Sequence, residues 1–215
     1  MNILAPLRDK LVLSAAGANF MTGLVGNVSI PTYSGSTVGW AGEVDAAKDG
    51  AGTFGEVELS PKRLTAYVDI SKQFLIQDSA SAEALLRKDI VDALSNKLEA
   101  TILGDVAGDA TKPAGLFAGV TADTAAITFA DILKMEQTLE EKNVGGNIKF
   151  IASPAAKAIL RTTAVGGTKS DLRMLMEGNE IDGISTLVTN GMISKGLILG
   201  NFNDLVIGQW GGINS

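Results

Sequence analysis

The chain has 215 residues, of which 46 % are apolar, and a formal net charge of −6. This length allows one large domain or two small ones, and the apolar fraction excludes general disorder. The acidic balance argues against a protein that grips nucleic acid by neutralising phosphates. No run approaches the ~20 apolar residues that cross a bilayer, so we expect a cytoplasmically made protein without membrane contact.

The chain contains no cysteine and no histidine. This excludes disulfides, zinc sites of the usual kind, and catalysis by Ser-His-Asp or Cys-His groups. The catalytic options that remain are carboxylate pairs, a Ser-Lys dyad and magnesium held by carboxylates.

The N-terminal part of the chain predicts one short helix followed by an extended passage. Pro6, placed near a first turn, indicates a helix over residues 6–13. Several glycines and Pro31 then interrupt the stretch from 21 to 36.

A hairpin is predicted between Thr37 and Ser60. Residues 37–44 form its outgoing arm, 45–52 its tip and 53–60 its returning arm, each arm reaching about 26 Å at ~3.3 Å per residue. These arms hold too few apolar residues for a core, and isolated hairpins are marginal in water. The hairpin is therefore either a loose surface loop or an arm that lies on a neighbouring subunit.

Part of this hairpin, from Gly50 to Val57, matches the pattern G-x-G-x-x-G-x-V that covers nucleotide phosphates in kinases. A dinucleotide site needs a strand before the glycines and a helix after them. Here residues 44–49 are polar and turn-like, and residues 56–60 alternate like a strand before Pro61. The kinase motifs H-R-D and D-F-G are absent. We therefore interpret the segment as part of a flexible arm.

Residues 64–71 alternate between apolar and polar side chains, which predicts a half-buried strand. The strongest helical pattern follows at residues 80–103, roughly 36 Å long at 1.5 Å per residue. Asp78 or Ser79 can cap its start, and Gly104 ends it. Its apolar stripe consists of Leu86, Ile90, Leu94, Leu98 and Ile102, widened by Leu85 and Val91. Its predicted solvated face carries Arg87, Lys88, Asp92, Asn96, Lys97 and Glu99.

The C-terminal half predicts a mixed region of helices and strands. Thr128 and Asp131 have capping-box spacing, and Ser153 before Pro154 is typical of a helix start. Helices are expected over residues 129–143 and 153–161, and strands over 148–152, 184–189, 197–199 and 205–209. The fold class is therefore α+β, with one long helix apart from a compact region of sheet and helices.

Several short segments, in this order and spacing, together resemble the major capsid proteins of tailed double-stranded-DNA bacteriophages, which share the Hong Kong-type capsid fold. They are residues 26–31, 39–43, 54–57, 59–64, 70–72, Leu75, 112–116, 153–155, 188–192 and 199–202. The resemblance covers nearly the whole chain. It implies an N-terminal segment (1–36), an extended-loop hairpin (37–63), a peripheral domain (64–115) built on a spine helix (80–103), and a compact axial domain (116–215).

The resemblance implies a structural subunit that assembles into pentamers and hexamers of an icosahedral shell. Such a shell encloses double-stranded DNA without sequence-specific binding, is found in the virion, and is made in the bacterial host cytoplasm. Scaffold, protease and portal proteins are the expected partners, and neither catalysis nor a cofactor is expected. An encapsulin-type compartment shell is the nearest alternative, and a nucleotide-binding enzyme using residues 50–57 is the alternative from another class.

Relatives of this kind usually have a further N-terminal arm and continue beyond the segment resembling residues 208–212. The resemblance therefore implies a chain shortened at one or both ends, whose strand 64–71 lacks a partner and presents an open edge. Such a chain is expected to be deficient in assembly or to form a non-native oligomer.

Contacts between subunits are expected along the hairpin and its base. The candidate residues are Trp40, Glu43, Phe54, Glu56, Lys62 and Arg63. Trp40 and Phe54 are the expected anchors, because large aromatic side chains carry much interface energy; the alternative is that both pack within their own subunit. Some relatives join a hairpin lysine to a neighbour's asparagine, which makes Lys48 and Lys62 the candidate cross-link residues.

Overall fold

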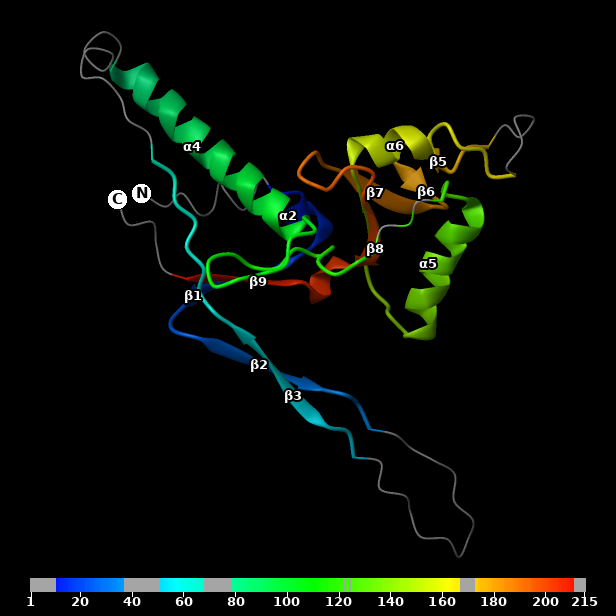
Figure 1. Ribbon diagram of the computed structural model, residues 1–215, viewed down its shortest axis with the longest axis horizontal. Coiled ribbons are helices and arrows are strands. Elements are labelled where there is room, and N and C mark those ends of the chain that lie inside the picture. Colours follow the sequence, from blue (N-terminus) through cyan, green and yellow to red (C-terminus); the bar gives the residue numbers. More distant parts are fainter. Residues whose placement is uncertain are drawn as a thin grey trace, which may run out of the picture. The chain divides into compact units, whose positions relative to one another are not determined.

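A computed structural model describes residues 11–36, 51–67, 79–121, 123, 125–166 and 173–210 (Figure 1). It divides into two compact units. The larger comprises Met1–Phe20, Lys62–Ile207 and Gly212–Ser215, and the smaller comprises Met21–Pro61 and Gly208–Gly211. The finer division into four segments stays a prediction.

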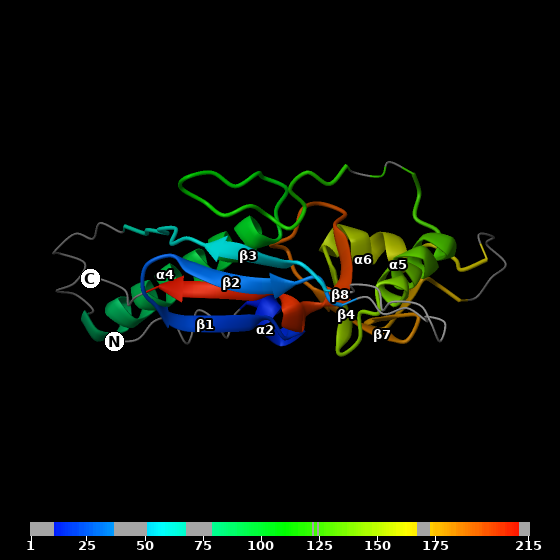
Figure 2. The ribbon, with the colours of Figure 1, turned by 90° about the horizontal axis from the view of Figure 1, so that it is seen from below.

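The smaller unit is built on a two-stranded antiparallel ribbon. Strand β2 (Val28–Tyr33) pairs with β3 (Phe54–Leu59), with Val28 opposite Leu59 and Tyr33 opposite Phe54 (Figure 2). The predicted returning arm is confirmed. The predicted pairing with residues 37–44 is wrong, because the partner strand is β2; residues 37–50 themselves lie outside the described part. Pro31 lacks a backbone N–H group, but this does not prevent the pairing. Each strand of a two-stranded ribbon has one edge that faces no partner strand, and an N–H group missing from that edge costs no hydrogen bond between the strands.

A second two-stranded sheet joins segments that are far apart in the sequence. It consists of β1 (Asn19–Leu24) and β9 (Val206–Trp210), so the strand expected at 205–209 is present. In the smaller unit, the Trp210 Nε1–H group donates a hydrogen bond of 2.6 Å to the carbonyl oxygen of Gly26. This bond fixes the turn before β2 to the end of β9.

The larger unit contains, among the described residues, a five-stranded mixed sheet. Its strands are β4 (Ile148–Ala152), β5 (Met176–Glu177), β6 (Glu180–Ile181), β7 (Ile184–Val188) and β8 (Leu197–Asn201). Their order in the sheet is β5-β6-β7-β4-β8. Strand β4, which lies next to the edge strand β8, pairs in parallel with β7 and antiparallel with β8. The β4 residues Phe150, Ile151 and Ala152 are fully buried, as expected for an apolar strand covered on both faces. The predicted strands at 148–152, 184–189 and 197–199 are confirmed.

Two helices lie beside this sheet, and local capping signals set where they begin (Figures 1 and 2). Helix α5 (Phe129–Glu141) starts with the predicted capping box, in which Asp131 accepts hydrogen bonds from the Thr128 N–H and hydroxyl groups. Helix α6 (Pro154–Leu160) starts at Ser153, whose hydroxyl accepts from the Ala156 N–H at 3.2 Å. Both predicted helices are confirmed to within two residues.

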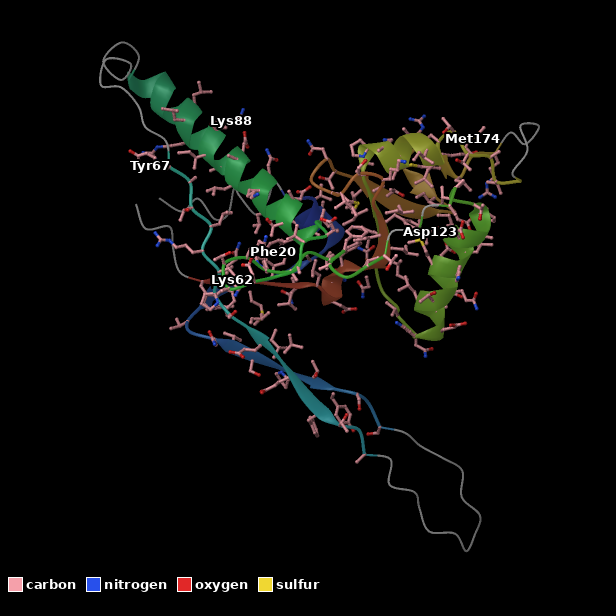
Figure 3. The ribbon with its side chains drawn as sticks, in the orientation of Figure 1. Phe20, Lys62, Tyr67, Lys88, Asp123 and Met174 are labelled. Atoms are coloured by element: carbon pink, nitrogen blue, oxygen red, sulfur yellow. The ribbon has the colours of Figure 1, made fainter. Side chains whose placement is uncertain are left out.

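The long helix is also confirmed, as α4 (Ser79–Ile102), but its buried side differs from the prediction. The predicted leucine stripe is only half-buried, and Leu85 is 64 % exposed. The buried line runs through Val91, which is buried as predicted, and continues through Ser95 and Glu99, which the prediction left out of the buried side. Glu99 is 7 % exposed, so its assignment to the solvated face was wrong. Lys88, by contrast, projects from the helix as predicted (Figure 3).

Glu99 holds the larger unit together through its carboxylate. Its Oε2 atom accepts a hydrogen bond of 3.1 Å from the N–H of Val12, and its Oε1 atom accepts a short one from the Thr189 hydroxyl. The Thr189 hydroxyl in turn accepts from the Gly191 N–H at 3.0 Å. Gly191 is required here, because an added Cβ would lie 2.9 Å from Glu99 Cγ. The carboxylate therefore joins α4 to two other segments of the chain.

One of these segments is the short helix α2 (Val12–Ala16). Five residues are too few to form a stable helix alone. Glu99 binds its first N–H group, and the Lys149 ammonium group donates to the carbonyl oxygen of Ala15 at 2.8 Å. These charges have the signs that the helix dipole favours at each end. The predicted helix over 6–13 is confirmed only at 12–13, and residues 1–10 lie outside the described part.

The predicted strand at 64–71 is wrong for the residues that the structure describes. Residues 61–67 are extended but belong to no strand, and Tyr67 is 88 % exposed (Figure 3). Alternation alone does not make a strand, because the backbone needs a neighbour to pair with. Residues 68–71 lie outside the described part.

The loop between α4 and α5 is shaped by Asp109. Its Oδ1 atom accepts hydrogen bonds from the Thr111 N–H and hydroxyl groups and from the Lys112 N–H, at 2.6 to 3.0 Å. These bonds, with a smaller contribution from the Lys112 charge, lower the pKa of Asp109 to about 2. The hydrogen bonds of this turn therefore stabilise the ionised carboxylate form of Asp109.

We expect the Asp109 turn to persist in acid until the pH falls to about 2. A lowered carboxyl pKa stabilises the fold above the ordinary value of about 4, and this contribution is lost as the pH falls through the folded-state pKa. An NMR titration of the Thr111 amide would follow the turn directly. A midpoint near the ordinary aspartate value would contradict these hydrogen bonds.

A second carboxylate, Glu136 on α5, is held in an unfavourable environment. Its Oε1 atom is buried, and the described residues offer it no hydrogen-bond partner. Burial, the charge of Asp182 and the charge of Glu140 all raise its pKa. Asp182 is itself paired with Arg173 at 3.1 Å.

We therefore expect Glu136→Gln to raise the unfolding temperature at neutral pH. A raised carboxyl pKa means that the folded state binds the proton more tightly, so wild-type stability increases as the pH falls through the folded-state pKa. The advantage of the variant should accordingly shrink as the pH approaches about 4. Thermal unfolding followed by circular dichroism measures this, with the exposed Glu177→Gln as control. Equal shifts for the two variants would contradict the unfavourable environment of Glu136.

Candidate assembly interface

The β2–β3 ribbon has two chemically different faces. Side chains alternate along each strand, and residues directly opposite each other share a face. One face is mainly apolar and pairs Val28 with Leu59 and Ile30 with Val57. The other face pairs Ser29 with Glu58, Pro31 with Glu56 and Tyr33 with Phe54. We call this second side the acidic-aromatic face.

The acidic-aromatic face holds its carboxylates in place with hydrogen bonds between the strands. The Ser29 hydroxyl donates to Glu56 at 2.8 Å, and the Asn27 amide donates to Glu58 at 2.5 Å. All four groups are exposed. They give the ribbon a defined, negatively charged surface.

Large apolar side chains are exposed along the ribbon. Phe54 is 83 % exposed, Val57 52 % and Tyr33 48 %. The Phe54 and Tyr33 rings contact each other with their centroids 4.7 Å apart and their planes at 37°. A contact of this kind orients the Phe54 ring but leaves most of it uncovered. Exposed apolar surface on a ribbon without a core of its own is typical of a surface that another molecule covers.

The glycine-rich segment meets the end of the ribbon in a cluster of hydrogen bonds between residues 33–36 and residues 51–54. We call this cluster the neck. The Gly52 N–H donates to the Tyr33 hydroxyl at 3.1 Å, and the Thr53 N–H donates to the Ser34 hydroxyl at 2.9 Å. The Ser34 N–H donates to the Thr53 carbonyl oxygen at 3.0 Å. The hydrogen bond with the Ser36 hydroxyl, and the one from the Gly52 N–H, lower the pKa of Tyr33.

This arrangement disfavours the nucleotide-binding interpretation of residues 50–57. A phosphate-binding loop presents unoccupied backbone N–H groups to the phosphate oxygens. Here the N–H groups of Gly52 and Thr53 are bound by side chains of the same ribbon. Glycine is needed for close approach instead: an added Cβ on Gly55 would lie 2.9 Å from the Thr32 hydroxyl oxygen.

The structure places only some of the predicted contact residues. Phe54 and Glu56 lie on the acidic-aromatic face, and Phe54 does not pack into the core of its own chain. Trp40, Glu43 and Lys48 lie outside the described residues. Sequence reasoning missed Tyr33, which adjoins Phe54 only because of the strand register.

The remaining two predicted residues, Lys62 and Arg63, belong to the larger unit and are exposed. The Lys62 ammonium group donates to the carbonyl oxygen of Ala110 at 3.3 Å (Figure 3). This contact ties the start of the extended segment 61–67 to the loop that Asp109 shapes. The cross-link roles of Lys48 and Lys62 stay predictions.

Among the residues that the structure describes, no group of three or more acidic side chains is placed to hold a metal ion. Within the same residues, no helix combines the length and the apolar character needed to cross a membrane.

The chain is similar in sequence to proteins of two phages. The chain is 26 % identical over 211 residues to the major capsid protein of Halomonas phage phiHAP-1, covering 95 % of this chain and 35 % of that protein. It is 26 % identical over 226 residues to the major capsid protein of Klebsiella oxytoca phage phiKO2, covering 95 % and 53 %. The chain thus spans about a third to a half of the length of these curated relatives.

Solved structures share the fold at low sequence identity. The capsid of an empty GTA particle superimposes with a TM-score of 0.69 at 16 % identity, covering 88 % of this chain and 72 % of that one. The structure from Mycobacterium phage Cain gives 0.69 at 14 % identity, covering 95 % and 72 %. The mixed α+β fold is therefore that of phage capsid structures, as the sequence predicted. The model of the phage capsid family matches residues 1–215, and the chain therefore belongs to the phage capsid family.

Proposed function

We propose that this chain is a structural subunit of a phage or prophage shell, and that it associates with further copies through the β2–β3 ribbon. The observation that carries the proposal is the exposed Phe54 ring on a ribbon without a core of its own. Membership of the phage capsid family supplies the kind of partner, which is a second copy of the same chain.

In this proposal, copies form pentamers and hexamers of an icosahedral shell in the virion, after synthesis in the host cytoplasm. The shell encloses double-stranded DNA by its geometry. The net charge of −6 supports this role, since an acidic subunit does not bind tightly to the phosphates that it encloses. Scaffold, protease and portal proteins are the proposed assembly partners.

We also propose that the chain performs no catalysis and needs no cofactor. The sequence offers neither histidine nor cysteine, and the backbone N–H groups of Gly52 and Thr53 are occupied. An encapsulin-type compartment is not favoured, since the relatives and structures described above come from phages and GTA particles.

The experiment that tests the shell proposal is negative-stain electron microscopy of the product of the complete gene, expressed with its immediate gene neighbours. Shells, or rings with five- or six-fold symmetry, are the expected result. Small asymmetric particles under every expression condition would contradict the proposal. A thermal-shift titration with ATP and magnesium should show no stabilisation, whereas saturating binding would raise stability by about 2.7 kcal/mol at a hundredfold excess over Kd.

A further inference from the structure

The neck of the ribbon contains more interactions than are needed to connect two strands. Beyond the β2–β3 ladder, the Gly52 N–H binds the Tyr33 hydroxyl, and that hydroxyl also lies 2.5 Å from the Ser36 hydroxyl. The Ser34 hydroxyl accepts from both the N–H and the hydroxyl of Thr53, at 2.9 and 3.2 Å. Side chains at the end of β2 and directly after it thus bind the backbone N–H groups of the two residues that precede β3.

Gly52 makes this arrangement possible through the absence of a side chain. An added Cβ would collide with the carbonyl oxygen of Gly35 and lie 2.8 Å from Tyr33 Cζ. The Tyr33 ring therefore passes directly over the Gly52 backbone. From there the Tyr33 ring extends to the Phe54 ring, and the two ring centroids lie 4.7 Å apart.

These contacts give Tyr33 two tasks that one side chain performs together. Its hydroxyl fixes the Gly52 backbone, and its ring fixes the direction of the Phe54 ring, which remains 83 % exposed. An exposed aromatic ring that is held in one orientation loses little conformational entropy when a partner covers it.

We propose that the neck is a preformed positioning device, in which Tyr33 holds Phe54 in the orientation that a second copy of the chain binds. Tyr33 is thus a positioning residue for assembly and acts through Phe54. This inference rests on the proposed function, since it assumes that the ribbon docks on another copy. It goes beyond that function by assigning the glycine-rich segment a role in preparing the docking surface before a partner arrives.

The test compares Tyr33→Phe with Tyr67→Phe in the product of the complete gene. Tyr33 and Tyr67 are the two tyrosines of the chain, so each variant removes one tyrosine hydroxyl and keeps the ring. Tyr67 is 88 % exposed and lies outside the ribbon, which makes it a matched control. Hydrogen exchange of the unassembled subunit, read by mass spectrometry on peptides covering residues 51–59, reports on the neck. Particle formation, followed by light scattering, reports on docking.

For Tyr33→Phe we expect exchange in residues 51–59 to be roughly tenfold faster and assembly to be roughly three- to tenfold slower. Tyr67→Phe should leave both unchanged. Unchanged exchange in Tyr33→Phe would overturn the preformed neck, and faster exchange with unchanged assembly would overturn its role in docking. The exchange comparison uses unassembled subunits, so it tests the neck whether or not particles form. A wild-type protein that formed no particles would therefore count against the proposed function alone.

Discussion

The variant Phe54→Asp is expected to fold like the wild type and to form no shells. Phe54 is 83 % exposed, so its replacement removes no core contact within the chain. Buried at the centre of an interface, a large aromatic side chain contributes about 2–4 kcal/mol, which corresponds to roughly 30- to 1000-fold in affinity. A carboxylate at the same place would also have to lose its water on docking, which adds to the penalty.

Sedimentation velocity and electron microscopy measure the loss of assembly, and thermal unfolding of the dissociated subunit shows whether the fold is kept. Phe54→Tyr serves as the conservative control, because it keeps the ring and is expected to assemble. Normal shells from Phe54→Asp would mean that the exposed ring plays no part in subunit contacts.

The second large effect concerns stability. Glu99→Ala is expected to lower the free energy of unfolding by about 2–4 kcal/mol, because it leaves the Val12 N–H and the Thr189 hydroxyl without their buried acceptor. Glu99 is only 7 % exposed, so water cannot easily replace the lost carboxylate. For a domain of this size, such a change lowers the Tm by roughly 5–15 °C. Urea unfolding of the dissociated subunit measures it.

The control for this prediction is Glu177→Ala, which removes an exposed glutamate from β5. Surface substitutions of that kind usually change stability by less than about 0.5 kcal/mol. Glu99→Gln should lie between the two, since an amide offers one acceptor oxygen where the carboxylate offers two. Equal stability of Glu99→Ala and Glu177→Ala would show that the Glu99 hydrogen bonds do not contribute to folding.

Elements with a local signal could be predicted from the sequence. The capping box at Thr128 and Asp131 and the Ser153-Pro154 helix start depend on residues within one turn, and they placed α5 and α6 correctly. The apolar run of β4 was equally informative, because a strand covered on both faces needs no alternation.

Features that depend on distant partners could not be read in this way. The hairpin signal identified β3, but the position of β2 depends on which of two extended stretches pairs with it. Residues 64–67 alternate like a strand, yet among the described residues they pair with none. Alternation reports on which side chains share a face, and it carries no information about the neighbouring strand.

The prediction that Glu99 lies on the solvated face of α4 failed for a related reason. Glu99 was assigned to solvent because it is charged, although it lies on the same four-residue spacing as the buried Val91, Ser95 and Leu103. That spacing is a signal that could have identified it as buried. At the candidate interface, Phe54 and Glu56 were predicted, whereas Tyr33 required the strand register.

The most direct test of the central claim, that the ribbon docks on another copy, is photocross-linking from position 54. Phe54 would be replaced by the photoreactive amino acid p-benzoyl-phenylalanine, which keeps a large aromatic ring at that place. Isotopically labelled and unlabelled subunits would be mixed before they assemble into particles. The purified particles would then be irradiated, and the adducts mapped by mass spectrometry. We expect adducts that join two copies of the chain, formed in particles and absent from dissociated subunits. Adducts confined within one chain in intact particles would contradict that claim.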